Sequence, residues 1–166
     1  MNLKNLKSLF TDNGCTKIYI KKLSPNDNSK NQVYFGGSFE ILNILPISEI
    51  KNEEAGDWNK ERFKATINFS WIGEDGNLYP APNAQLILYP KYPEVRFSGF
   101  LAKCANPPSE LMTQRLADRL LFFSVANEGK VLGFVAAPNS ELANEFANEK
   151  AISEHGVFKV IELPQV

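Results

Sequence analysis

The sequence is poor in histidine and cysteine, and it contains no long apolar run. His155 is the only histidine, so a histidine-pair metal site and a two-histidine phosphodiesterase are excluded within one protomer. Cys15 and Cys104 are the only cysteines, too few for a disulfide framework. No apolar run reaches the length of a membrane span, and the first residues show no charged region followed by an apolar one of the kind found in secretory signals. We therefore expect a soluble, cytoplasmic protein without a membrane partner.

Motifs for nucleotide binding and for nuclease chemistry are absent as well. The sequence has no Walker loop, no Gly-x-Gly-x-x-Gly and no Pro-Asp followed at nuclease distance by Glu-x-Lys. Glu128-Gly129-Lys130 falls in an expected hairpin turn, and Gly36-Gly37 is too short to cradle a phosphate and is interpreted as a strand break. Candidate catalytic residues are therefore few, and we expect that this domain by itself is not an enzyme.

What is present suits one compact β-rich domain. The 166 residues are 43% hydrophobic and 11% aromatic, with twelve phenylalanines, enough for a sizeable core packed by rings. Strict alternation from Phe63 to Trp71 predicts a half-buried strand. Residues 49–62 are charged and read as irregular. The other expected strands are 16–23, 32–35, 84–89, 96–101, 120–125, 131–136 and 156–162. Helices are expected near residues 3–10 and at 39–45, 105–118 and 140–148.

These elements occur in mixed order, which favours an open barrel or sandwich with short helices over a doubly wound α/β fold. The first two strands, 16–23 and 32–35, are expected to close a wide hairpin. We find no internal repeat and expect a single domain over residues 1–166.

The segment Lys17–Gln32 is the most informative part of the sequence. Ile18 and Ile20 alternate with polar neighbours as in a half-buried strand, which then runs into a polar loop containing Ser24-Pro25. Almost every side chain of this loop can donate or accept a hydrogen bond, as contacts to phosphates and base edges require. A solvated surface hairpin is the alternative interpretation.

The segment Tyr89–Phe100 is the second candidate, because two prolines stiffen a loop that carries charged residues. Arginine bonds guanine bidentately and glutamate accepts from the cytosine amino group, so Glu94 and Arg96 suit a G·C pair in the major groove. Their spacing places both on one face of an extended chain. A surface salt bridge on a sheet edge is the alternative.

The net charge of -1 argues against a nucleic-acid partner, but the charge is unevenly distributed. Residues 1–32 carry six basic against two acidic side chains, and residues 104–166 carry five against eight. The basic surplus therefore lies on the first candidate loop, consistent with a local positive face.

Together, the two segments resemble the N-arm and the C-arm of the effector-binding domain of type IIE restriction endonucleases related to EcoRII. Those domains share the pseudobarrel fold of the plant B-three (B3) transcription-factor domain. The strongest parts of the resemblance are Tyr19–Asp27, Gln32-Val33 and Glu94-Val95-Arg96 leading into Ser98-Gly99, and it covers most of the chain. It implies a mainly β, seven-stranded open pseudobarrel with short helices.

The resemblance also implies DNA-binding residues on both arms, which grip the duplex like a wrench and read a short, GC-containing site in the major groove. On the N-arm these residues are Lys21, Lys22, Asn26, Asp27, Asn28, Ser29, Lys30, Asn31 and Gln32, with Lys21, Lys22 and Gln32 at the arm's base. On the C-arm they are Lys91, Tyr92, Glu94 and Arg96.

The implied function is that of a sequence-specific double-stranded DNA-binding domain, monomeric in isolation, from a type II (IIE-like) restriction endonuclease. The resemblance implies a catalytic domain C-terminal to Val166, and a parent nuclease that uses Mg²⁺. DNA binding itself is expected to need no metal or cofactor.

Two functions of other classes remain open from the residues alone. One is a small barrel enzyme or ligand-binding domain whose pocket is lined by phenylalanines, Tyr34 and Trp71. The other is a protein-interaction module that uses the two proline-bearing loops.

Overall fold

The computed structural model of the chain describes residues 1–23, 32–35, 41–46, 51–55, 60–89, 94–98, 119–149 and 159–165. At Gln32, residues 51–55 and 60–62, Pro82, Asn83 and Glu94 it describes the backbone alone. The predicted helix 105–118 lies outside these residues.

Strands dominate the described chain. They are β1 (Lys17–Lys22), β2 (Gln32–Tyr34), β3 (Lys51–Ala55), β4 (Lys60–Ile72), β5 (Leu78–Tyr89), β6 (Glu94–Ser98), β7 (Leu120–Val125), β8 (Val131–Val135) and β9 (Lys159–Glu162). The helices are α1 (Leu3–Asp12), α3 (Ile41–Ile44), α5 (Glu141–Glu145) and the 3₁₀ turn η2 (Asn127–Gly129). Within the described residues, none of the helices is long and apolar enough to cross a membrane.

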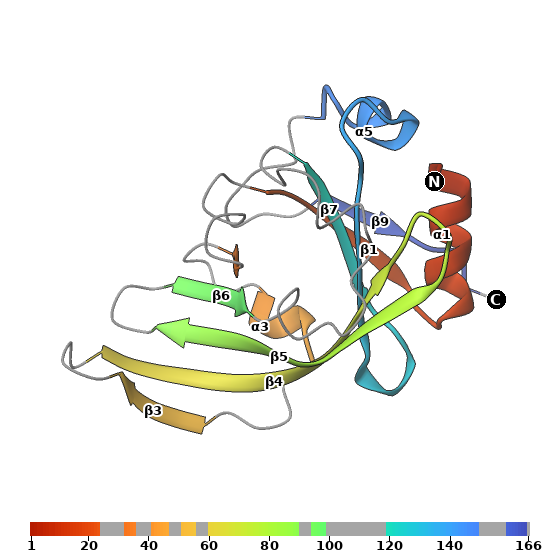
Figure 1. Cartoon of the computed structure of the whole chain (residues 1–166). Coiled ribbons are helices and arrows are strands. Elements are labelled where there is room, and N and C mark those ends of the chain that lie inside the picture. Colours follow the sequence, from red (N-terminus) through yellow and green to blue (C-terminus); the bar gives the residue numbers. More distant parts are fainter. Residues whose placement is uncertain are drawn as a thin grey trace.

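The described strands form a single curled sheet in the order β2-β6-β5-β4-β8-β7-β1-β9. Strand β3 lies off this path and pairs with the first residues of β4. All pairs are antiparallel except β4 with β8. In Figure 1, β3 to β6 form one wing and β1, β7, β8 and β9 form the other, while β4 and β5 run from one wing into the other. A register shift between Ile67 and Phe69 interrupts the β4–β5 ladder, and such bulges bend and twist a sheet. The predicted mainly β, open pseudobarrel is confirmed, with nine described strands in place of seven.

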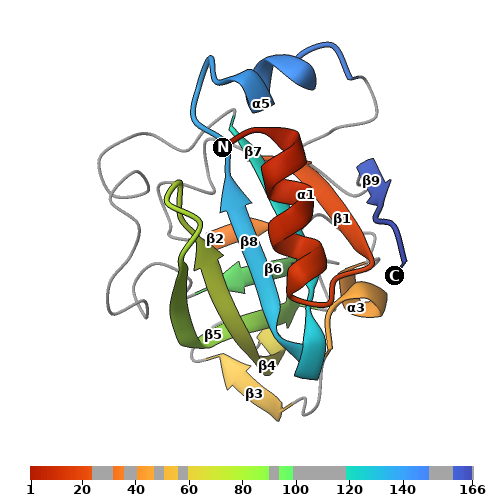
Figure 2. The ribbon, with the colours of Figure 1, turned by 90° about the vertical axis from the view of Figure 1, so that its right-hand side faces the viewer.

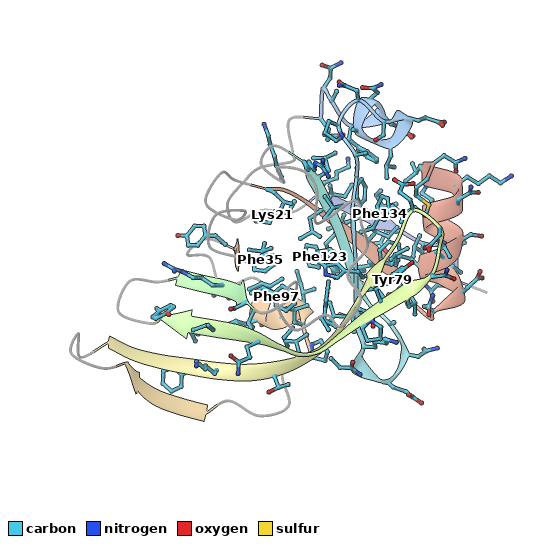
Figure 3. The ribbon with its side chains drawn as sticks, viewed as in Figure 1. Lys21, Phe35, Tyr79, Phe97, Phe123 and Phe134 are labelled. Carbon is cyan, nitrogen blue, oxygen red and sulfur yellow. The ribbon has the colours of Figure 1, made fainter. Side chains whose placement is uncertain are left out.

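Buried hydrophobic side chains form two clusters, one between the wings and one beneath helix α1. Between the wings, the Phe69 ring lies edge-on to Trp71 and Phe97, with centroids 4.8 and 5.0 Å away. Figure 3 shows Phe35, Phe97 and Phe123 converging on this space. On the other face, Phe10 of α1 is fully buried in a second cluster with Phe122 and Phe134, and Figure 2 shows α1 lying across β8 and β1. Because successive side chains of a strand point to opposite faces, the same strands contribute to both clusters.

Local sequence signals explain the ends of helix α1. The Asn2 side chain caps it by accepting from the Asn5 backbone N–H at 2.8 Å. Beyond its end, Gly14 has a φ of +82°, where a Cβ would come within 2.1 Å of the Asn127 side chain. The Asn127 N–H also donates to the Asn13 carbonyl at 3.0 Å. The turn after α1 therefore packs directly against the β7–β8 connection.

Two expectations about this sheet were wrong. The first two strands do not form a hairpin, because β1 pairs with β7 and β9 whereas β2 pairs with β6. Residues 51–55, expected to be irregular, form strand β3 along β4. Alternation identifies a strand but not its partner, and the charged composition of β3 hides a strand that pairs on one side only.

Candidate nucleic-acid interface

The two predicted arms are carried by the ends of described strands. The N-arm leaves β1 after Lys22 and returns at Gln32, and the C-arm leaves β5 after Tyr89 and returns at Glu94. The tip residues Asn26, Asp27, Asn28, Ser29, Lys30, Asn31, Lys91 and Tyr92 lie outside the described residues. Their predicted DNA contacts therefore stay predictions.

The ladder between β2 and β6 sets the spacing of the arm bases. Gln32 lies opposite Ser98, whereas Tyr34 lies opposite Arg96. The N-arm thus rejoins the sheet beside the end of β6, and the C-arm rejoins it at the start, four residues from Ser98. At about 3.3 Å per residue this is a separation of roughly 13 Å along the strand.

Strand β6 separates apolar from charged side chains by simple alternation. Val95 and Phe97 are 0% and 5% exposed and point into the core between the wings, while Arg96 between them is half-buried on the opposite face. Glu94 occupies a register position of the same parity as Arg96. Because the structure describes only the backbone at Glu94, the sharing of one face by Glu94 and Arg96 stays a prediction.

Tyr89 belongs to this group, although the sequence argument did not select it. It lies opposite Glu94 in the last pair of the β5–β6 ladder, and Ile87 lies opposite Arg96. The guanidinium carbon of Arg96 lies over the Tyr89 ring, 5.4 Å from the centroid, within the range of a cation–π contact. The signal in the sequence was only that Tyr89 ends the predicted strand next to the C-arm.

The neighbouring lysines at the base of the N-arm have different environments. Lys21 is fully buried, on the same side of β1 as the core between the wings (Figure 3). Its Nζ donates to the Lys22 carbonyl at 2.9 Å. Lys22 is half-buried and lies opposite Leu120. Alternation along β1 thus turns Lys21 inward, and a phosphate contact by Lys21 does not fit this burial, whereas Lys22 retains access to solvent.

A third cation, Arg119, lies at the base of the N-arm and was not among the predicted residues. Its carbonyl accepts from the Leu23 N–H at 2.8 Å, which extends the β1–β7 ladder by one pair. Arg119 is only 5% exposed, and burial lowers the pKa of its guanidinium. A pocket of about 360 Å³ adjoins this point between β7 and the α5 region, with Lys22, Arg119, Asn139, Asn144 and Glu149 in its lining.

The core between the wings offers little room for a ligand. Its cavity of about 20 Å³ is lined by apolar side chains that include Phe35, Trp71 and Phe123. Small-molecule pockets typically measure about 300–1,000 Å³. The cavity therefore does not support the aromatic-lined ligand pocket that the sequence left open.

The described strands form a curled, open sheet, and the bases of the two predicted arms lie at opposite ends of strand β6. No protein-family model and no curated protein sequence matches the chain. Among solved structures, it is similar to the B3 domain of the UbaLAI restriction endonuclease, a triple-methionine mutant crystallised with cognate DNA. The TM-score is 0.53 at 21% sequence identity, over 95% of this chain and 96% of that one. The chain therefore has the fold of a restriction-endonuclease B3 domain.

Proposed function

We propose that this chain is a sequence-specific double-stranded DNA-binding domain of a type II, IIE-like restriction endonuclease. The observation that carries the proposal is the likeness to a B3 domain solved with cognate DNA, which spans 95% of this chain and 96% of that domain. The likeness therefore extends over almost the whole of both chains. The separated bases of the two predicted arms support the same function.

In this proposal affinity and specificity come from different residues. Lysines such as Lys22 neutralise phosphates, which adds affinity without reading sequence. Glu94 and Arg96 read a G·C pair from the start of the C-arm strand, together with the arm tips. Binding needs no metal, and the isolated domain binds as a monomer.

The wider context belongs to the same proposal. The domain recognises an effector copy of the target site, and a catalytic module C-terminal to it cleaves DNA with Mg²⁺. The resemblance of the arm segments to EcoRII-related effector domains supports this arrangement. Residues 1–166 then bind DNA and do not cleave it.

The test is a selection from random duplexes followed by affinity measurements with and without EDTA. We expect one short GC-containing site to be enriched, equal binding with EDTA, and a steep fall of affinity with salt. Enrichment of no duplex would reject the DNA-binding function. Cleavage by the pure 166-residue protein in magnesium would instead show that the domain is itself a nuclease.

A further inference from the structure

Tyr89 and Arg96 are held next to each other by the register of β5 and β6. Because Tyr89 pairs with Glu94 and Ile87 pairs with Arg96, Tyr89 and Arg96 are diagonal neighbours on one face of the sheet. Their side chains meet, with the guanidinium carbon 5.4 Å from the ring centroid. The opposite face of β6 at this point is closed by the buried Val95 and Phe97.

We propose that Tyr89 is a positioning residue that presets the guanidinium of Arg96 for base recognition. This inference rests on the proposed function and deepens it, because it names a residue that acts on DNA through Arg96. The sequence-based site contains Arg96 but not Tyr89.

The physical reason lies in the long side chain of arginine. A bidentate contact to guanine requires the guanidinium plane in one orientation, and ordering a rotamer-rich side chain on binding lowers affinity. A guanidinium over an aromatic face is attracted to the ring, and where it stacks parallel to the ring its in-plane N–H donors remain available for a base. The ring of Tyr89 therefore lowers the entropy that the Arg96 side chain loses when it binds DNA.

The phenol hydroxyl has no part in this role, which gives a conservative variant. Tyr89→Phe keeps the ring face and should preserve both affinity and base preference. Tyr89→Leu removes the ring and should weaken binding to the selected site by about two- to five-fold. Discrimination should fall at one base pair, the pair at which Arg96→Ala also loses it.

A double-mutant cycle separates positioning from a general effect on folding. In the Arg96→Ala background, Tyr89→Leu should change affinity no further, because no guanidinium remains to be held. Tyr79→Leu, at the other end of β5, is the matched control and should leave base preference unchanged. Thermal unfolding of every variant shows which proteins are folded.

A second measurement needs no DNA. In the free protein, the ring current of Tyr89 should shift the Arg96 Nε–H proton resonance upfield, and the shift should persist in Tyr89→Phe and vanish in Tyr89→Leu. If the wild-type protein selects no duplex, the proposed function fails. If it selects a site and Tyr89→Leu discriminates like wild type, or if the upfield shift survives in Tyr89→Leu, the positioning role alone is overturned.

Discussion

The ammonium of Lys21 donates to the backbone carbonyl of Lys22, 2.9 Å away, so that two lysines adjacent in sequence have different environments. Lys21 is fully buried, and Lys22 is half-buried beside the pocket at the start of β7. Lys21 is therefore a candidate for a structural role, and Lys22 is a candidate for a phosphate contact.

Replacing these lysines one at a time should change different properties, DNA binding for Lys22 and stability for Lys21. Lys22→Ala should lower the magnitude of the slope of log affinity against log salt by about 0.9, with sequence preference unchanged, as loss of one phosphate contact would. Lys21→Ala should instead cost about 2–4 kcal/mol of unfolding free energy, because it empties a buried site and removes a hydrogen bond. Salt titrations of duplex binding and urea unfolding measure the two effects. A changed salt slope for folded Lys21→Ala with none for Lys22→Ala would reverse the assignment.

Arg96 should carry base discrimination rather than bulk affinity. Arg96→Ala should cost about 1–3 kcal/mol with the selected site and relax discrimination at one G·C pair. Arg96→Lys should keep the attraction to phosphates yet lose that discrimination, because lysine lacks the planar fork. Affinities for duplexes with each base substituted in turn provide the measurement. An intact specificity profile in both variants would assign Arg96 a structural role.

Gly133 of β8 permits close packing against the aromatic core. A Cβ at this position would come within 2.7 Å of Phe69 Cζ and 3.2 Å of Trp71 Cζ3. Gly133→Ala should therefore lower the unfolding free energy by about 1–3 kcal/mol through overpacking. Urea unfolding checks this, with Ser8→Ala on the exposed side of α1 as a control expected within about 0.5 kcal/mol of wild type. Equal stability of the two variants would show that the rings yield without cost.

The turn between β4 and β5 should make the stability of the hairpin depend on pH. Hydrogen bonds from the Tyr79 hydroxyl, first, and from the Asn77 backbone N–H hold the pKa of Asp75 below its ordinary value. A carboxyl whose pKa is lowered by folding adds stability that is present above its unfolded pKa and is lost as pH falls through the folded pKa. Tyr79→Phe should raise the pKa of Asp75 toward the ordinary value.

Two measurements test this expectation. An NMR titration of the Asp75 carboxyl compares its pKa in wild type and Tyr79→Phe. The difference between their unfolding midpoints should be largest near neutral pH and should shrink as the pH drops through the acid range. A difference that stays constant with pH would mean that the Tyr79 hydroxyl does not act through the charge of Asp75.

Local patterns were sufficient to locate most of the described elements. The alternation from Phe63 to Trp71 predicted the central part of β4, and the stripe containing Leu6 and Phe10 predicted α1. These features follow from chain geometry alone, because the side-chain period of a strand or helix is set by its backbone.

Pairing and burial, in contrast, depended on the tertiary structure. No local signal separates a β1–β2 hairpin from the observed pairing of β2 with β6, because backbone hydrogen bonds are alike for every partner. The burial of Lys21 depends on which face of β1 the curled sheet encloses. The contact between Tyr89 and Arg96 depends on the register across the C-arm. The sequence by itself determined most of the strands and the alternation of side chains along them, and the curvature of the sheet decided which faces meet, because burial is a property of the assembled surface and not of the chain.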